Sequence, residues 1–111
     1  MPPEELHLKL LRLLEEDPTR SQRELARALG ISVGGTNHAV RALLARGLVK
    51  AQNFRRSRNK RGYLYVLTPS GLQEKARLTY HLLQQKRAEH EALMGEIEEL
   101  RAEIQSQRDN I

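Results

Sequence analysis

The sequence predicts a mainly α-helical protein with one small β-hairpin, and three observations support this prediction. Leucines with helical spacing lie near the N-terminus, and two segments with helix-capping residues follow over residues 21–46. Short strand-like stretches then lie on either side of a basic segment, and residues 70–111 contain no proline. We expect two domains, a compact one over residues 1–68 and a single long helix over residues 69–111.

The first predicted helix runs from about Pro3 to Glu16 and ends before Asp17-Pro18, because a residue that precedes proline avoids the α region. Its apolar stripe, with spacings of i, i+4, i+7 and i+8, consists of Leu6, Leu10, Leu13 and Leu14. Leu8 and Leu11 lie off this stripe. They are either ordinary surface leucines or a second apolar face that packs on another helix or subunit. We favour the second interpretation, because two extra leucines on a short helix form a patch.

Two capped helices are predicted next, separated by a tight turn. Ser21 and Glu24 have the spacing of a capping box, in which each side chain accepts a hydrogen bond from the other residue's backbone amide. Gly30 can take the positive φ that closes a helix, and Ser32 is placed to cap the following helix, which runs to about Arg46.

The helix over residues 33–46 has one apolar face and one polar face. The predicted apolar set is Val33, Thr36, Val40, Leu43 and Leu44. The remaining face carries Gly34, Gly35, Asn37, His38, Arg41 and Ala45. This remaining face is the candidate reading surface, by which we mean the surface that would contact the base edges of bound DNA.

The stretch after this helix carries the whole excess of positive charge. Leu48 to Phe54 and Tyr63 to Leu67 are predicted strands, and Asn59 and Gly62 are expected to shape the turn between them. Residues 48–68 contain six cations and no acid, whereas the flanking parts of the chain mix both signs. These cations are Lys50, Arg55, Arg56, Arg58, Lys60 and Arg61. Helix, turn, helix and basic hairpin in this order describe a winged helix-turn-helix, which is typical of double-stranded DNA binding.

Binding strength is expected to come mainly from phosphate contacts by Arg55, Arg56, Arg58, Lys60 and Arg61. Sequence discrimination is expected from Asn37, His38 and Arg41, since asparagine pairs with adenine and arginine with guanine. A phosphate contact is an equal alternative for Arg41, and His38 has the alternative of a polar surface residue. Ser32, Gly34 and Gly35 allow close approach of phosphate or base edges at the helix start, although simple tolerance of glycine in a first turn explains Gly34 and Gly35 equally well.

The last helix is expected to begin with Thr68 as N-cap and Pro69 at its first position. Its distal half has a heptad seam formed by Leu93, Ile97, Leu100 and Ile104. Isoleucine at position a with leucine at position d favours a parallel two-stranded coiled coil. The same register places Glu96 and Glu103 at g and Arg101 and Arg108 at e, where opposite charges of a parallel partner meet. We expect a homodimer; an exposed or intramolecular helix is the alternative. Lys86 and His90 weaken the seam further back, so the leucines of the first helix and residues 72–83 are expected to contribute to the dimer.

The composition argues against several other classes. The chain has no cysteine, and its four histidines have no metal-ligand spacing, so neither a metal site nor any other cofactor is expected. No catalytic constellation or phosphate-binding glycine loop is present, so we expect no enzyme. No apolar stretch is long enough for a membrane span, and the N-terminus lacks the features of a signal peptide. The protein is expected in the cytoplasm.

Several segments resemble a known family. Two runs are similar to the helix-turn-helix of the MarR superfamily: Ser21-Gln22-Arg23-Glu24-Leu25-Ala26 and Leu29-Gly30-Ile31-Ser32. More specific are the run from Gly47 to Arg55, Asn59-Lys60, Leu67-Thr68-Pro69-x-Gly71 and Glu74-Lys75-Ala76-Arg77, which resemble the small MarR-family regulators associated with exopolysaccharide gene clusters. The resemblance implies a bacterial transcriptional regulator acting near polysaccharide genes. Gly35 stands where a larger polar side chain is expected, and the extra helices that build the effector pocket of longer MarR proteins are missing. The resemblance therefore does not imply a small-molecule effector for this protein.

Two other functions compete with this interpretation. The winged fold can serve as a protein-interaction module that only supports the coiled coil. Alternatively, the basic hairpin can bind nucleic acid without regard to sequence. Six uncompensated cations argue against the first of these, and the effect of changing Asn37 and Arg41 on sequence preference tests the second.

Overall fold

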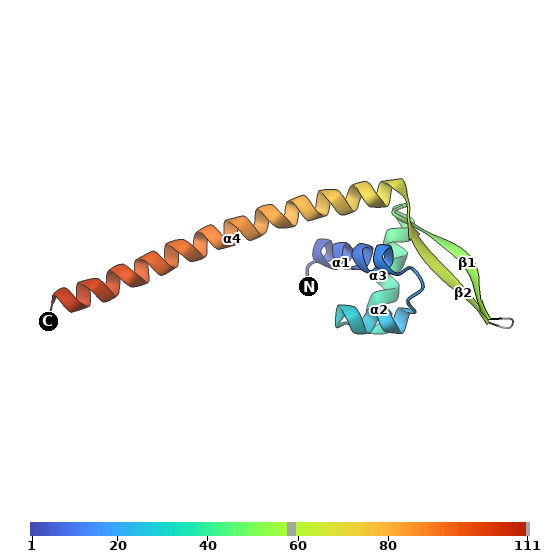
Figure 1. Cartoon of the computed structure of the whole chain (residues 1–111), viewed down its shortest axis with the longest axis horizontal. Coiled ribbons are helices and arrows are strands. Elements are labelled where there is room, and N and C mark those ends of the chain that lie inside the picture. Colours follow the sequence, from blue (N-terminus) through green and yellow to red (C-terminus); the bar gives the residue numbers. More distant parts are fainter. Residues whose placement is uncertain (58–59, 111) are drawn as a thin grey trace. The chain divides into compact units, whose positions relative to one another are not determined.

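The computed structural model describes residues 1–57 and 60–110, with side chains described outside residues 54–63. It confirms a mainly helical fold with one two-stranded antiparallel sheet (Figure 1). The elements are α1 (Pro3–Glu16), α2 (Gln22–Leu29), α3 (Val33–Ala45), β1 (Val49–Ser57), β2 (Lys60–Leu67) and α4 (Pro69–Asp109). Residues 1–79 form one compact unit and residues 80–111 another. The division of function at residue 68 stays a prediction.

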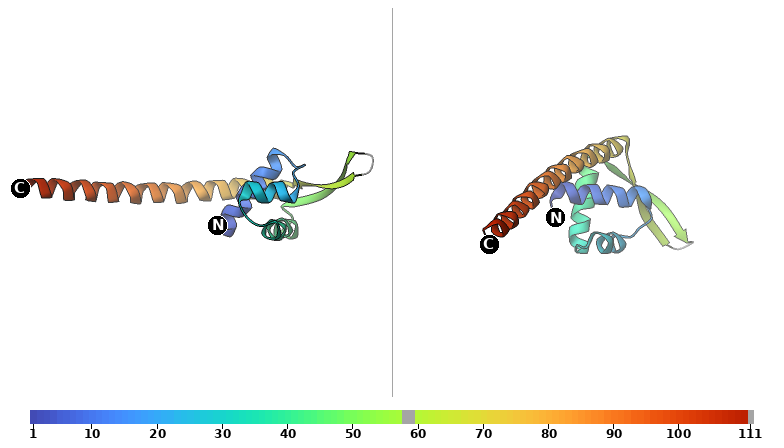
Figure 2. Two further views of the ribbon diagram at one scale, coloured as in Figure 1. Left: turned by 90° about the horizontal axis from the view of Figure 1, so that it is seen from below. Right: turned by 60° about the vertical axis from the view of Figure 1, so that its left-hand side comes forward.

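The core of the first unit is built around α1, which packs against α2, α3 and β2 (Figure 2). Four of its leucines are at most 1% exposed: Leu8, Leu10, Leu11 and Leu14. Leu6 and Leu13 of the predicted stripe are only half-buried. The buried arc is wider than one stripe because neighbours cover α1 on several sides. The interpretation of Leu8 and Leu11 as surface leucines is wrong. They pack within their own unit and offer no face to a second subunit.

The helix-turn-helix follows the predicted capping. Ser21 Oγ accepts from the Glu24 amide at 3.1 Å, and the Glu24 carboxylate accepts from the Ser21 amide at 3.4 Å. Gly30 closes α2 with a φ of 70°, a left-handed conformation that costs glycine little. Ser32 Oγ then accepts from the Gly35 amide at 3.0 Å and caps α3. Local hydrogen bonds therefore fix the turn between the two helices.

The buried face of α3 differs in part from the predicted one. It consists of Thr36, Ala39, Val40 and Leu43, which have the spacing i, i+3, i+4 and i+7. Val33, predicted to be apolar core, is 46% exposed because it is the first residue of the helix and lies beyond the packed turns. Thr36 is fully buried, and its hydroxyl donates to the Ser32 carbonyl at 3.0 Å, which satisfies it inside the core.

The hairpin is longer than predicted. β1 and β2 pair from Val49 opposite Leu67 out to Ser57 opposite Lys60. The predicted strands ended at Phe54 and began at Tyr63, because the basic segment was assigned to a loop. Backbone pairing requires no apolar side chains, however, so the ladder continues through that segment. Gly62 pairs with Phe54 inside the ladder, and its predicted place in the turn is wrong.

The start of α4 is tied to the end of α3 through one threonine. As predicted, Thr68 caps the helix: its Oγ1 accepts from the Gly71 amide at 3.0 Å. The same hydroxyl donates to the Gly47 carbonyl at 2.6 Å, and the Thr68 amide donates to the Leu48 carbonyl at 3.0 Å. These bonds hold both ends of the hairpin beside each other. α4 then continues without a break for 41 residues.

Candidate nucleic-acid interface

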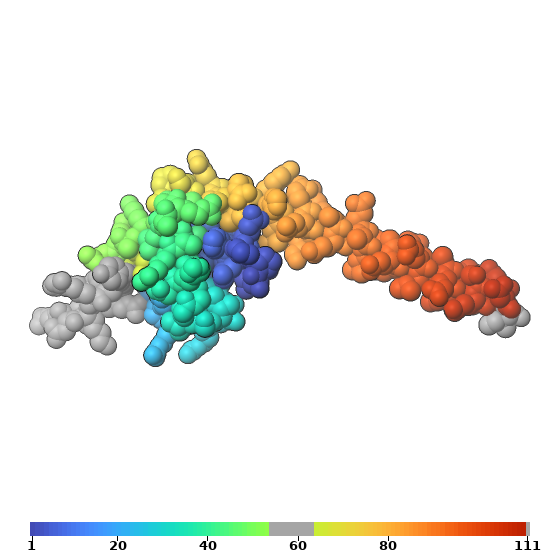
Figure 3. All heavy atoms as spheres, turned by 180° about the vertical axis from the view of Figure 1, so that it is seen from behind, coloured from blue at the N-terminus to red at the C-terminus, as the bar shows by residue number. Residues whose placement is uncertain are grey.

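One face of α3 is open to solvent and carries the predicted reading residues. Gly34, His38, Arg41 and Ala45 are exposed on it. Asn37 and Gly35 are half-buried at its border. In the space-filling view, atoms of α2 and α3 form a continuous surface (Figure 3). The structure thus presents these residues together, and their roles in base contact stay predictions.

The two glycines at the start of α3 have different surroundings. A Cβ at Gly35 would lie 3.2 Å from Ser32 Oγ, which is the hydroxyl that caps the helix. A side chain there would press on the cap, so Gly35 has a local structural reason. A Cβ at Gly34 would meet nothing closer than Ser32 Oγ at 4.0 Å. Packing therefore does not account for Gly34, and close approach of a ligand to the helix start remains an available explanation.

Asn37 has a partner that the sequence did not reveal. Its Nδ2 donates to Oε1 of Gln22, the first residue of α2, at 3.1 Å. Both side chains are half-buried. The bond joins residues 15 positions apart, so it depends on how α2 and α3 cross and has no signature in the sequence. It links the start of α2 to the exposed face of α3.

The hairpin carries the basic residues in its distal half. The register places Arg55 directly opposite Arg61, and Lys60 opposite Ser57. Arg56 also lies in β1, and Arg58 and Asn59 fall outside the described residues.

An ion cluster around one buried carboxylate connects the C-terminal end of α3 to α4. Glu74 of α4 is only 8% exposed and accepts hydrogen bonds from the guanidinium groups of Arg46 and Arg77. The hydrogen bond from Arg77, and then that from Arg46, hold the pKa of Glu74 below its ordinary value although burial opposes them. Arg46 caps the C-terminal end of α3. The cluster therefore holds the end of the candidate reading helix in place.

The charges of the same cluster affect the pKa of His7 in α1. Burial lowers its pKa, the positive charge of Arg46 lowers it further, and His38 adds a smaller effect in the same direction. Glu74 opposes these effects. Because the pKa lies below 6.5, His7 is neutral at neutral pH, and its protonation at lower pH works against the folded state.

Replacing Glu74 by glutamine is expected to lower the unfolding free energy at pH 7 by about 2 kcal/mol, the usual worth of hydrogen bonds to a charged group. The pKa of Glu74 is lower in the folded protein than its ordinary 4.5, so its contribution is present above that pH and is lost as the pH falls. Urea unfolding at a series of pH values should therefore show the parent and the variant converging below about pH 4.

The matched control is Glu98→Gln on the same helix. Its partner Arg101 lies 3.6 Å away, and both side chains are mostly exposed. An exposed pair of this kind contributes little, so this variant should unfold like the parent at every pH. A pH-independent loss in Glu74→Gln would show that packing, rather than charge, explains its effect.

Comparison with known proteins supports the fold of the first unit. Residues 3–50 match the sequence family described as winged helix-turn-helix DNA-binding. The match and the hairpin that follows it agree in a winged helix-turn-helix fold for this unit. No curated protein matches the sequence.

Several solved structures have similar folds. The PcaV transcriptional regulator from Streptomyces coelicolor, in complex with its natural ligand, has a TM-score of 0.64 and 23% sequence identity, covering 74% of this chain and 57% of that one. MarR from Staphylococcus aureus, in complex with salicylate and kanamycin, has a TM-score of 0.56 and 16% identity, covering 74% and 53%. The multiple antibiotic-resistance repressor MarR from Listeria monocytogenes has a TM-score of 0.54 and 20% identity, covering 90% and 71%.

These likenesses show that the chain shares the fold of MarR-type regulators. The chain spans less than two thirds of the length of PcaV and of the Staphylococcus aureus protein. Among the described residues, no helix combines the length and apolarity that crossing a membrane requires.

Proposed function

We propose that this protein is a bacterial transcriptional regulator that binds double-stranded DNA sequence-specifically as a homodimer. One observation carries the proposal. The exposed polar face of α3 is followed directly in the chain by a hairpin region with six cations and no acid. A helix that presents side chains to the major groove and a cationic hairpin that neutralises phosphates are the two parts that such recognition needs.

The proposal assigns different roles to the two parts. On α3, Asn37, His38 and Arg41 contact base edges, while the α3 start at Ser32, Gly34 and Gly35 lies against the sugar-phosphate backbone. The hairpin supplies the phosphate contacts through Arg55, Arg56, Arg58, Lys60 and Arg61. A reading surface of three side chains carries little information, so we propose that two copies act on a near-palindromic site, with half-sites about 10 base pairs apart.

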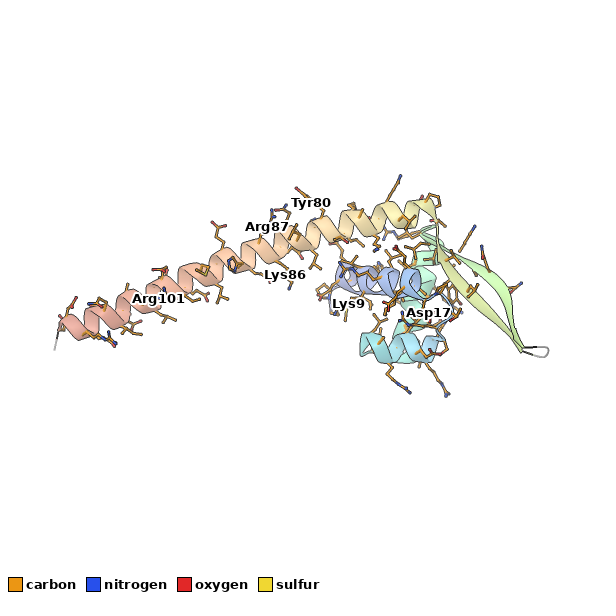
Figure 4. All side chains as sticks on the ribbon, viewed as in Figure 1. Lys9, Asp17, Tyr80, Lys86, Arg87 and Arg101 are labelled. Atoms are coloured by element: carbon orange, nitrogen blue, oxygen red, sulfur yellow. The ribbon has the colours of Figure 1, made fainter. Side chains whose placement is uncertain are left out.

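The exposed side chains of α4 support a second copy as its partner. From residue 80 to residue 110 every residue is exposed except Leu82 and Ile97, which are half-buried. Tyr80, Lys86, Arg87 and Arg101 extend into solvent (Figure 4). The seam residues Leu93, Leu100 and Ile104 are each more than half exposed, at 54%, 59% and 52%. Such a row of apolar side chains at heptad spacing gains by burial against an identical helix.

The same heptad register continues towards the start of α4. Counting back by sevens from Leu93 and Ile97 places Leu72 and Thr79 at d, and Ala76 and Leu83 at a. All four are exposed, whereas Gly71, Glu74 and Leu78 on the other side of the helix are buried in their own unit. The winged domain thus leaves the seam face of this section free, which supports a dimer interface along most of α4. The contribution that we expected from helix α1 is withdrawn, because four of its leucines are buried within their own unit and the other two are half-buried.

The regulated genes are proposed from the sequence resemblance alone. The segments from Gly47 to Arg77 resemble regulators associated with exopolysaccharide clusters, so polysaccharide-related genes are the proposed targets. A DNA-binding role places the protein in the cytoplasm, at the nucleoid.

Selection of duplexes from a random pool, followed by affinity measurements on two variants, tests the proposal. Asn37→Ala with Arg41→Ala should reduce the preference for the selected duplex over a random one by about tenfold or more, since each base contact contributes about 1–3 kcal/mol of discrimination. Replacing Arg55, Arg56 and Arg58 by alanine should instead weaken binding to all duplexes. It should also make the salt dependence, with an expected log–log slope near −7 for about eight phosphates, much shallower.

The outcomes separate the competing functions. Unchanged discrimination in the α3 variant together with lost affinity in the hairpin variant would identify a sequence-indifferent nucleic-acid binder. No measurable duplex binding by the parent protein at low salt would instead favour the protein-interaction module.

A further inference from the structure

We infer that Gln22 is a positioning residue for base recognition, which holds the amide of Asn37 so that Asn37 reads adenine. This inference rests on the proposed function, because it specifies how the reading face of α3 selects a base. It rests on the hydrogen bond between the side chains of Gln22 in α2 and Asn37 in α3.

The geometry fixes Asn37 from one side. Its Nδ2 donates to Gln22 Oε1 at 3.1 Å, and both residues are half-buried between the two helices. The neighbouring residue His38 and, one turn further, Arg41 are exposed on α3. Asn37 therefore lies at the border of the exposed face, and its amide nitrogen is bound to the protein.

The chemistry of the amide defines what the remaining edge can bind. An asparagine side chain has an oxygen that accepts and a nitrogen with two hydrogens. We infer that Gln22 takes the hydrogen trans to Oδ1, which leaves the cis hydrogen and Oδ1 as an adjacent donor and acceptor. Adenine presents the complementary pair in the major groove, with N7 as acceptor and the N6 amino group as donor. Guanine presents two acceptors there and would place one of them against Oδ1.

The hydrogen bond to Gln22 also orients the side-chain amide of Asn37 before DNA binds. A free asparagine side chain rotates about its last bond and loses that freedom on binding, which reduces affinity. The bond to Gln22 restricts the rotation in the unbound protein. Gln22 is the first residue of α2, and its own Nε2 remains available as a donor at a helix start, where phosphate groups bind favourably. A single glutamine can thus connect a backbone phosphate to the base-reading amide.

The test uses the full-length protein and single-base variants of the duplex selected from a random pool. Gln22→Met has a similar length and no amide, so it should reduce the preference for adenine at one position of each half-site by about tenfold. Its melting temperature should not change. Gln22→Glu keeps the acceptor for Asn37 but replaces the donor with a negative charge. It should retain the adenine preference and bind all duplexes more weakly.

Two controls make the result specific. Gln84→Met, at an exposed position of α4 that the register places at b, outside the proposed seam, should leave affinity and preference unchanged. In the Asn37→Ala background, Gln22→Met should have no further effect on the adenine preference, because the two residues act through one amide.

The inference and the proposed function fail in different ways. If Asn37→Ala removes the preference and Gln22→Met retains it, Gln22 does not position Asn37, and the inference is overturned. The same holds if the two substitutions have additive effects. If the parent protein shows no preference among duplexes, the proposed function itself is overturned.

Discussion

Replacing Gly71 by alanine is expected to lower the unfolding free energy by about 3 kcal/mol, at the upper end of the usual cost of overpacking. A Cβ at this position would lie 1.9 Å from the Leu48 carbonyl oxygen and 3.0 Å from its carbon. Both are backbone atoms, so no side-chain rotation relieves the clash. The same carbonyl accepts from the Thr68 amide at 3.0 Å, so any shift of α4 also disturbs the cap of the helix.

Thermal and urea unfolding followed by circular dichroism would measure this loss, and α4 itself offers the matched control. Gly95 lies inside the same helix, and a Cβ there would meet no atom within 4 Å. Gly95→Ala should therefore stabilise the protein by about 0.5–1 kcal/mol, through the higher helix propensity of alanine. Equal melting temperatures for Gly71→Ala and the parent would mean that α4 does not pack against Leu48 in solution.

The reason for Gly71 illustrates what the sequence reveals and what it hides. Local signals predicted the cap at Thr68, the capping box at Ser21 and the left-handed glycine at Gly30, because each depends on residues within a few positions. The need for glycine at position 71 comes from the carbonyl of Leu48, which lies 23 positions earlier in the chain. Sequence resemblance included this glycine but supplied no physical reason for it.

Periodicity predicted the exposed side of a helix better than the full extent of its buried side. The exposed side of α3 follows from its periodicity, and the structure exposes most of it. Leu8 and Leu11 lie off the apolar stripe of α1 and were expected to form a second apolar face; they are buried because α1 contacts three neighbouring elements of its own unit. Gln22, the partner of Asn37, and Arg46, one of the two partners of Glu74, are 15 and 28 positions away, so these two contacts required the fold.

Replacing Ile97 by lysine is expected to convert the protein to a monomer and to weaken binding to a two-half-site duplex by about a hundredfold. The substitution places two ammonium groups at one layer of the proposed seam, where burying unpaired charge is costly. The loss in DNA affinity follows because a dimer holds its second winged domain at high effective concentration beside the second half-site, which a monomer cannot do. Light scattering would measure the mass, and titration of single and paired half-sites would measure the affinities.

Ala102→Lys is the matched control, since the same register places Ala102 at f, on the outside of a two-stranded coil, and it is exposed. This variant should stay dimeric and bind DNA at least as tightly as the parent. If Ile97→Lys is monomeric and binds a single half-site as tightly as the parent, the two units have distinct roles. The winged domain then contacts the DNA, and α4 joins two winged domains. If Ile97→Lys stays dimeric, the seam from Leu93 to Ile104 is not the interface, and the exposed section from Leu72 to Leu83 becomes the surface to change next.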